Sequence, residues 1–119
     1  MATNQKDSER KVKFNLDYRV KKSRKFRKLD KKEEAFFQKK LKEFARLTIA
    51  QFEQGAARPR VWHDEWPGTP PSILSEEILN KSLYRINFGY KMRVFAIRNA
   101  PEKNNEFLVI WIDATHKSG

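Results

Sequence analysis

The segment FLVIWID, residues 107–113, constrains the fold of this chain more than any other stretch. Its apolar run shows no alternation of apolar and polar side chains, which indicates a strand that is covered on both faces and lies inside a sheet. Polar residues that can move protons or hold anions follow at once: Asp113, Thr115, His116 and Lys117. The end of this strand is therefore a candidate position for a functional site.

Two other segments near the C-terminus have the pattern of strands, LYRINFG and MRVFAIR. The first alternates Tyr84, Ile86 and Phe88 with polar residues, and the tight GYK connection to the second predicts a β-hairpin. A turn at APEKNNE then joins the hairpin to FLVIWID. Three consecutive strands are therefore expected at the end of the chain.

The N-terminal half predicts one strand and two helices. KVKFNLDYRV, residues 11–20, alternates apolar and polar side chains, which is typical of a half-buried strand. Asp30 is a suitable N-cap for a helix, and Glu33 completes a capping box. Thr48 begins a second, short helix in the same way, and Gly55 ends it.

Residues 56–75 hold four of the five prolines and two of the three tryptophans, so no long regular element is expected there. A short helical turn capped by Ser75 follows. The order β-α-α-β-β-β predicts an α+β fold of a single domain, in which a helical hairpin packs on a mostly antiparallel four-stranded sheet.

At 119 residues the chain has room for one domain, expected over residues 11–119 after a disordered N-terminal tail, residues 1–10. The absence of cysteine excludes disulfides and thiolate metal sites. The sequence contains neither a stretch of membrane-spanning length nor the apolar region of a signal peptide. We therefore expect a soluble, cytoplasmic protein without a membrane partner.

The charge of the chain is strongly positive, at +11, and unevenly distributed. Residues 1–30 contribute +7, because they hold eleven basic and four acidic side chains. The most basic stretch is VKKSRKFRK, residues 20–28. Such a patch attracts a polyanion, either nucleic acid or an acidic protein. The alternative is a solvated face that only keeps the protein in solution.

The last three strands could assemble a site for phosphodiester cleavage. The hairpin would place Arg85 near Arg93 or Lys91, because residues equidistant from a turn oppose each other. The last strand would bring Asp113 and His116 to the same edge of the sheet. Arginine can grip a phosphate and stabilise its growing negative charge, and histidine can transfer protons near neutral pH. In the alternative interpretation, the arginines are ordinary outward-facing residues and His116 is a solvated side chain near the C-terminus.

The loop residues His63, Asp64 and Glu65 suggest a metal site, but this is the weaker interpretation. Adjacent residues seldom ligate one ion together, and no second histidine or cysteine is nearby in the sequence. We therefore predict no metal, and we interpret the segment as a cover over the edge of the core that Trp62 and Trp66 anchor.

The segment SLYRINFGYKMRVFAIR followed by FLVIWIDATHK, with the element order and the basic stretch, resembles the RelE/ParE toxin superfamily over about residues 12–117. The resemblance implies the toxin component of a type II toxin-antitoxin pair. Such a RelE-like endoribonuclease cleaves mRNA, free or on the ribosome, and a cognate antitoxin protein holds it inactive. The substrate's own 2′-hydroxyl would be the attacking group, so the resemblance implies neither a metal nor a small-molecule cofactor.

By this resemblance, Arg93 is the strand arginine that contacts the scissile phosphate, Arg85 is a second basic position, and His116 acts in acid–base chemistry. Asp113 and Glu77 are the candidates for a carboxylate base. Further contacts to the RNA are expected from basic residues at seven positions: Lys21, Lys22, Arg24, Lys25, Arg27, Lys91 and Lys117.

Two other functions fit the same sequence. The chain could be a non-catalytic nucleic-acid- or protein-binding module that uses VKKSRKFRK as its contact surface. It could also be a ParE-like inhibitor of DNA gyrase, since a fold alone does not assign an activity. The tryptophan-proline loop at residues 58–72 is longer than a minimal member of the superfamily needs.

Overall fold

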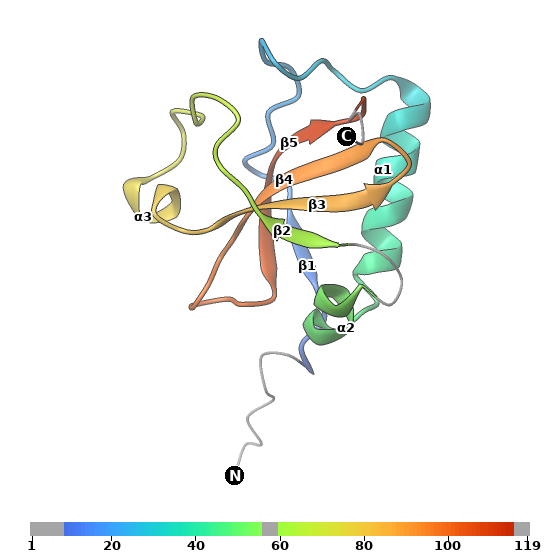
Figure 1. Cartoon of the computed structure of the whole chain (residues 1–119), viewed down its shortest axis with the longest axis vertical. Coiled ribbons are helices and arrows are strands. Elements are labelled where there is room, and N and C mark those ends of the chain that lie inside the picture. Colours follow the sequence, from blue (N-terminus) through green and yellow to red (C-terminus); the bar gives the residue numbers. More distant parts are fainter. Residues whose placement is uncertain (1–8, 56–59, 116–119) are drawn as a thin grey trace.

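A five-stranded sheet forms the centre of the protein (Figure 1). The computed structural model describes residues 9–55 and 60–115. In chain order the elements are β1 (Lys13–Asn15), α1 (Lys31–Phe44), α2 (Ile49–Gln54), β2 (Val61–His63), α3 (Glu76–Leu79), β3 (Leu83–Gly89), β4 (Met92–Arg98) and β5 (Glu106–Asp113).

The strands lie in the order β1-β5-β4-β3-β2. β5 has a neighbour on each side and is buried from Glu106 to Ile112, as its unbroken apolar run predicts. β1 runs parallel to β5, whereas the other neighbouring strands are antiparallel. The predicted α+β fold of one domain is confirmed, but the predicted four-stranded sheet is wrong: the sheet is mixed and has a fifth strand.

The strand that the sequence did not reveal is β2, which pairs antiparallel with β3. Three residues are too few to show an alternating pattern, and the surrounding prolines and tryptophans favour an irregular loop. β2 places Trp62 directly opposite Arg85 of β3. A segment predicted to be irregular therefore contributes a neighbour to a candidate site residue.

Helices α1 and α2 cover one face of the sheet (Figure 1), which we call the helix-covered face. Both begin with the predicted capping boxes, at Asp30 and Thr48. α2 ends at Gly55, whose φ of 66° lies in the left-handed region that favours glycine. Both helix starts and the α2 end are thus confirmed.

Aromatic rings hold α1 and α2 on this face. Phe88 of β3 is fully buried, and its ring centroid lies 5.0 Å from Phe44 and 5.7 Å from Phe37 of α1. Phe52 of α2 packs against Phe107 of β5 at 5.6 Å. Interlocked rings of this kind bury a large apolar area and fix the helices against the strands.

The opposite face, which we call the loop-covered face, lies under α3 and two long loops, residues 16–30 and 64–75 (Figure 1). Phe26 of the first loop packs on Phe95 and Trp111, with ring centroids 5.4 and 5.7 Å apart. Trp66 of the second loop lies 5.8 Å from Trp111. The predicted helical turn is α3, and Ser75 caps it.

The first strand is shorter than predicted. Only Lys13–Asn15 form β1, because the side chain of Asn15 accepts a hydrogen bond from the backbone N–H of Asp17 and turns the chain. Tyr18, predicted to share a face with Val12, packs instead against the apolar cluster of the loop-covered face.

The ends of the chain lie only partly within the structure. Of the predicted tail, residues 1–8 fall outside the described residues, whereas the Arg10 carbonyl accepts a hydrogen bond from the Ile49 N–H at 2.8 Å. Within residues 9–55 and 60–115, no helix has the length and apolar character needed to cross a membrane.

Candidate functional site

The strand register gathers several polar side chains at the end of the sheet next to the β3–β4 hairpin. Arg93 of β4 lies opposite Asn87 of β3 on one side and opposite Asp113 of β5 on the other. Arg85 precedes Asn87 by two residues, so it projects from the same face of β3. This is the loop-covered face, because Phe95, which lies opposite Arg85, belongs to its apolar cluster.

Arg85 and Arg93 are therefore diagonal neighbours, because Arg85 lies directly opposite Phe95. Diagonal cross-strand residues remain within reach of long side chains. Burial lowers the pKa of Arg93, the charge of Arg85 lowers it further, and Asp113 acts in the opposite direction. The guanidinium nevertheless stays charged near neutral pH, because arginine side chains are not deprotonated in proteins.

Arg93 is only 9% exposed, and its guanidinium is bound to the hairpin. Its Nη1 donates hydrogen bonds to the side-chain oxygen of Asn87 at 2.8 Å and to the carbonyl oxygens of Met92 and Tyr90 at 3.0 and 3.3 Å. The strand pattern allowed an ordinary outward-facing arginine, and the resemblance to the toxin superfamily implied one that contacts a phosphate. The structure gives Arg93 a role in holding the β3–β4 turn.

Arg85 is more accessible, with 32% of its side chain exposed. Its Nε lies 3.3 Å from a carboxylate oxygen of Asp64, and its guanidinium carbon lies 5.4 Å from the ring centroid of Trp62. A guanidinium over an indole ring and beside a carboxylate is held in place but is not sealed from water. Arg85 is therefore the arginine of this face better placed to meet a ligand.

The basic loop, residues 21–28, crosses the end of the sheet beside β5. Phe26 anchors it on the loop-covered face, and the hydroxyl of Ser23 accepts a hydrogen bond from the Phe26 N–H at 3.0 Å. Lys22, Arg24 and Lys25 are exposed around this anchor. An aromatic residue that is buried among lysines and arginines fixes the loop while its charges stay in water.

Arg27 differs from the other cations of the basic loop because it is paired. Its two terminal nitrogens donate to the two carboxylate oxygens of Glu33 at 2.7 and 2.6 Å. Hydrogen bonding to Arg27 lowers the pKa of Glu33, and the same bond raises the pKa of Arg27. Arg27 thus joins the loop to the first turn of α1.

Three hollows follow one another across this end of the sheet. The central hollow, about 310 Å³, lies between residues 22–27 and residues 112–115. A second, of about 410 Å³, shares residues 23–26 with it and extends to Trp111 and Pro67. The third, of about 400 Å³, shares Ala114 with the central hollow and reaches α1 and the hairpin. The basic loop lines two of the three.

Asp113 is the carboxylate at the centre of this region. Its Oδ1 accepts hydrogen bonds from the backbone N–H of Thr115 at 2.9 Å and from the Thr115 hydroxyl at 3.1 Å. Glu77, the other candidate base, is exposed on α3 and lines a different hollow with Lys81 and Arg98. Of these two candidates, the structure brings only Asp113 to the arginines.

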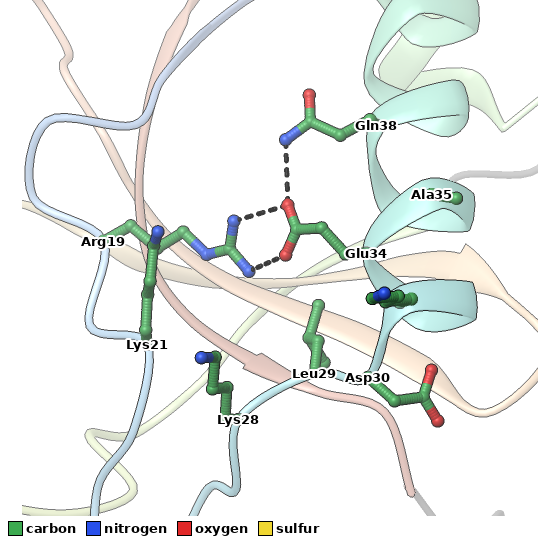
Figure 2. A pocket seen from close by; sticks show the side chains of 9 residues that line it. Arg19, Lys21, Lys28, Leu29, Asp30, Glu34, Ala35 and Gln38 are labelled. Atoms are coloured by element: carbon green, nitrogen blue, oxygen red, sulfur yellow. Dashed lines mark hydrogen bonds and ion pairs between the residues drawn. The ribbon is translucent and has the colours of Figure 1, made fainter.

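A partly buried ion pair that the sequence did not reveal supports the start of the basic loop (Figure 2). Both terminal nitrogens of Arg19 donate to the carboxylate of Glu34 on α1, at 2.9 and 2.6 Å, and Gln38 donates to the same carboxylate at 3.0 Å. The hydrogen bonds from Arg19, and to a smaller extent the one from Gln38, lower the pKa of Glu34 to about 2. Lys21 and Lys28 lie beside the pair in Figure 2.

Of the remaining predicted site residues, only Lys91 lies within the described residues. Lys91 is exposed at the tip of the hairpin. His116 and Lys117 lie outside the described residues, so the structure gives no position for either. Asp64, considered above as part of a metal site, pairs with Arg85, and the described residues contain no group of three potential ligands that could hold a metal ion.

No protein-family model matches this chain, and neither does any curated protein or any solved structure at a significant level. The residues of the site are therefore the basis of the functional proposal.

Proposed function

We propose that this protein binds single-stranded RNA and cleaves it without a metal, as a RelE-like endoribonuclease that forms a type II toxin–antitoxin pair. The observation that carries the proposal is the register of β3, β4 and β5, which puts Arg85, Arg93 and Asp113 on one face. The basic loop borders the central hollow next to Asp113. A polyanion drawn to the loop would therefore meet the arginines and the carboxylate together.

The element order supports the same proposal. A helical hairpin separates the first strand from the three C-terminal strands, which is the order on which the resemblance to the RelE/ParE superfamily rests. β2 is an addition at the far edge of the sheet and leaves β3, β4 and β5 adjacent.

The proposed reaction is attack by the RNA 2′-hydroxyl on the neighbouring phosphorus. The new bond joins the 2′-oxygen to phosphorus, and the bond from phosphorus to the 5′-oxygen breaks. The products are a 2′,3′-cyclic phosphate and a 5′-hydroxyl. A base must take the proton of the 2′-hydroxyl, and an acid must give a proton to the leaving oxygen.

The residues of the site would divide these tasks. Asp113, held by Thr115, is the proposed base, and His116, which follows Thr115 in the sequence, is the proposed acid. Arg85 would contact a non-bridging phosphate oxygen and stabilise the charge of the transition state. Arg93, which is buried beside Arg85, would add positive charge near the phosphate and keep the hairpin in place.

The partners follow from the same proposal. The substrate would be mRNA, free or on the ribosome, and the natural inhibitor would be an antitoxin protein. An acidic antitoxin segment that covers the basic loop would block access to the central hollow, because the loop carries unpaired positive charge at Lys22 and Arg24 on its exposed side.

A second candidate function is RNA binding without cleavage. The burial of Arg93 and its hydrogen bonds to the hairpin favour this candidate, because they give the arginine a structural task. In that case the basic loop and Arg85 would bind RNA, and Asp113 would serve only to end β5.

Incubation of the purified protein with an end-labelled mRNA fragment, with and without ribosomes, separates the two candidates. We expect cleavage that a chelator does not abolish, with cyclic-phosphate ends on the upstream products. Arg85→Gln, Asp113→Asn and His116→Ala should each slow cleavage by about 100-fold or more. Arg46→Gln, which removes an exposed arginine beyond the end of α1, is the matched control and should cleave normally.

Two results would decide against the endoribonuclease. If the intact protein binds RNA but yields no products under either condition, it is a binding module. If all three site variants cleave as fast as the Arg46→Gln control, the reaction takes place elsewhere on the molecule.

A further inference from the structure

The tip of the β3–β4 hairpin displays an aromatic side chain that packing does not explain. Tyr90 is 92% exposed, and its φ of 55° is left-handed, a conformation that residues other than glycine rarely adopt. Backbone conformations of this kind persist only where the surroundings impose them, and they cluster at sites of ligand binding. The exposure of the ring and the strained backbone together make Tyr90 a candidate ligand-binding residue.

Hydrogen bonds to Asn87 and from the buried Arg93 hold the turn in this conformation. The side-chain oxygen of Asn87 accepts hydrogen bonds from the Gly89 N–H and from Arg93 Nη1, both at 2.8 Å. The same Nη1 donates to the carbonyl oxygen of Tyr90 at 3.3 Å. Besides its proposed role near the phosphate, Arg93 therefore fixes the backbone from which the Tyr90 ring projects.

The ring of Tyr90 stands at the rim of the third hollow. Its centroid lies 6.2 Å from that of Phe36 on α1, with the two ring planes at 81°. Met92 and Ala114 complete the apolar lining, and the hollow of about 400 Å³ lies within the usual size range of small-molecule sites. An apolar recess of this size suits a flat, uncharged group.

The rim of this third hollow is positively charged, because Lys32 and Lys91 line it. The one carboxylate of the lining, Glu33, is occupied by Arg27. A ligand that suits this rim carries negative charge beside its flat apolar part.

The third hollow adjoins the central hollow, which the basic loop lines. Ala114 lines both the third hollow and the central hollow, where residues 22–27 form the other wall. A chain of phosphates along the basic loop would thus lead directly to the Tyr90 ring.

We propose that Tyr90 and Phe36 form a stacking site for one unpaired nucleobase of an RNA strand whose phosphates lie on the basic loop. The inference rests on the RNA binding of the proposed function and does not require cleavage. Aromatic platforms beside basic grooves bind single strands in this way, because every base offers a π-face. Arg93 acts on this site as a positioning residue, through the turn.

The test compares the affinity of three short RNAs of one length by fluorescence anisotropy: a single strand, the same strand with one abasic position, and a duplex. We expect Tyr90→Leu to weaken binding of the intact single strand by about 5- to 150-fold, the range for loss of one stacked base. Tyr90→Phe, which keeps the ring, should bind like the unchanged protein. The duplex, which offers no unpaired base, should bind Tyr90→Leu and the unchanged protein equally.

Tyr90→Gly separates binding from folding. Glycine suits a φ of 55°, so this variant should unfold at the same temperature as the unchanged protein or higher, while its affinity for the single strand falls as in Tyr90→Leu. Arg93→Gln tests the positioning role: it should weaken single-strand binding, and the double variant Arg93→Gln/Tyr90→Leu should be no weaker than the weaker single variant.

Failure of this inference and failure of the proposed function give different results. If Tyr90→Leu binds the single strand normally, the stacking site is refuted whether or not the protein cleaves RNA, and a protein partner becomes the occupant to test. If the variants lose affinity as expected but no RNA is ever cleaved, the stacking site stands and the endoribonuclease does not.

Discussion

The two faces of one sheet differ in what covers them and in what they contain. The helix-covered face meets α1 and α2 through interlocked rings such as those of Phe44 and Phe88. The loop-covered face meets two loops and a one-turn helix, and beside its apolar cluster it carries Arg85, Arg93 and Asp113. A strand side chain that faces a helix must be apolar to pack, whereas one that faces a loop can keep a charge near water.

The comparison suggests a division of labour within a small domain. Helices supply regular apolar surface, so we expect changes on the face that they cover to have the larger effect on stability. Loops leave hollows and can be lined with charge, so the face that they cover is where the phosphates of a ligand can bind. The proposed base-stacking site adjoins this face at the end of the sheet, against α1. Changes on the two faces should therefore separate stability from binding.

The largest expected effect is on the helix-covered face. Phe88→Ala removes a fully buried ring that contacts three others, and it should lower the free energy of unfolding by about 3–5 kcal/mol. Chemical denaturation measures this change. Phe88→Leu, which leaves a smaller cavity, should lower the free energy of unfolding clearly less than Phe88→Ala. If the two variants lose the same free energy, the ring contacts contribute little.

A smaller loss of stability is expected from Phe26→Ala on the loop-covered face, about 2–3 kcal/mol, because a loop can collapse into the space. This change should also weaken RNA binding, although it removes no charge, because Phe26 anchors the basic loop. The same denaturation and anisotropy measurements test both effects. If Phe26→Ala destabilises the protein as much as Phe88→Ala, the two faces do not differ in stability as proposed.

The link between the two faces is the pair of Arg19 and Glu34, and its contribution should depend on pH. In the folded protein the pKa of Glu34 is lowered to about 2 from an ordinary 4.5. The pair therefore stabilises the fold fully above about pH 4.5, and this contribution disappears as the pH falls towards 2. Because 37% of the Glu34 side chain is exposed, water screens the pair, and we expect about 1 kcal/mol at neutral pH.

Glu34→Gln measures this contribution. Its free energy of unfolding should be lower than that of the unchanged protein at pH 7, and the difference should vanish between about pH 4.5 and pH 2. Glu43→Gln on the same helix, which breaks an exposed pair with Lys40, is the control and should change stability little. A difference for Glu34→Gln that is constant with pH would contradict the assigned pair.

The sequence predicted the helix-covered face well for physical reasons. The capping boxes at Asp30 and Thr48 are local patterns, and the unbroken apolar run of β5 reports coverage on both faces directly. Local signals of this kind need no knowledge of distant contacts.

The loop-covered face was harder to predict because its contacts join residues that are distant in sequence. Arg19 meets Glu34 fifteen residues away, and Arg85 meets Trp62 only because of a strand too short to recognise. Arg93 lies between apolar residues of β4, where a charged side chain is expected to face water, but its guanidinium folds back onto carbonyl groups of the hairpin. No alternation of residues reports these contacts.

The most direct test of the division between the faces compares two triple variants that lower the net charge equally. Lys22→Gln/Arg24→Gln/Lys25→Gln removes exposed charges of the basic loop, and Lys39→Gln/Lys42→Gln/Arg46→Gln removes exposed charges on and beyond α1. The measurement is the affinity for single-stranded RNA as a function of salt concentration. The loop variant should lose about 2 units of the slope of log affinity against log salt, as expected for three lost phosphate contacts, and the helix variant should keep its slope. Equal losses in both variants would show that RNA responds only to net charge, and the assignment of binding to the loop-covered face would be wrong.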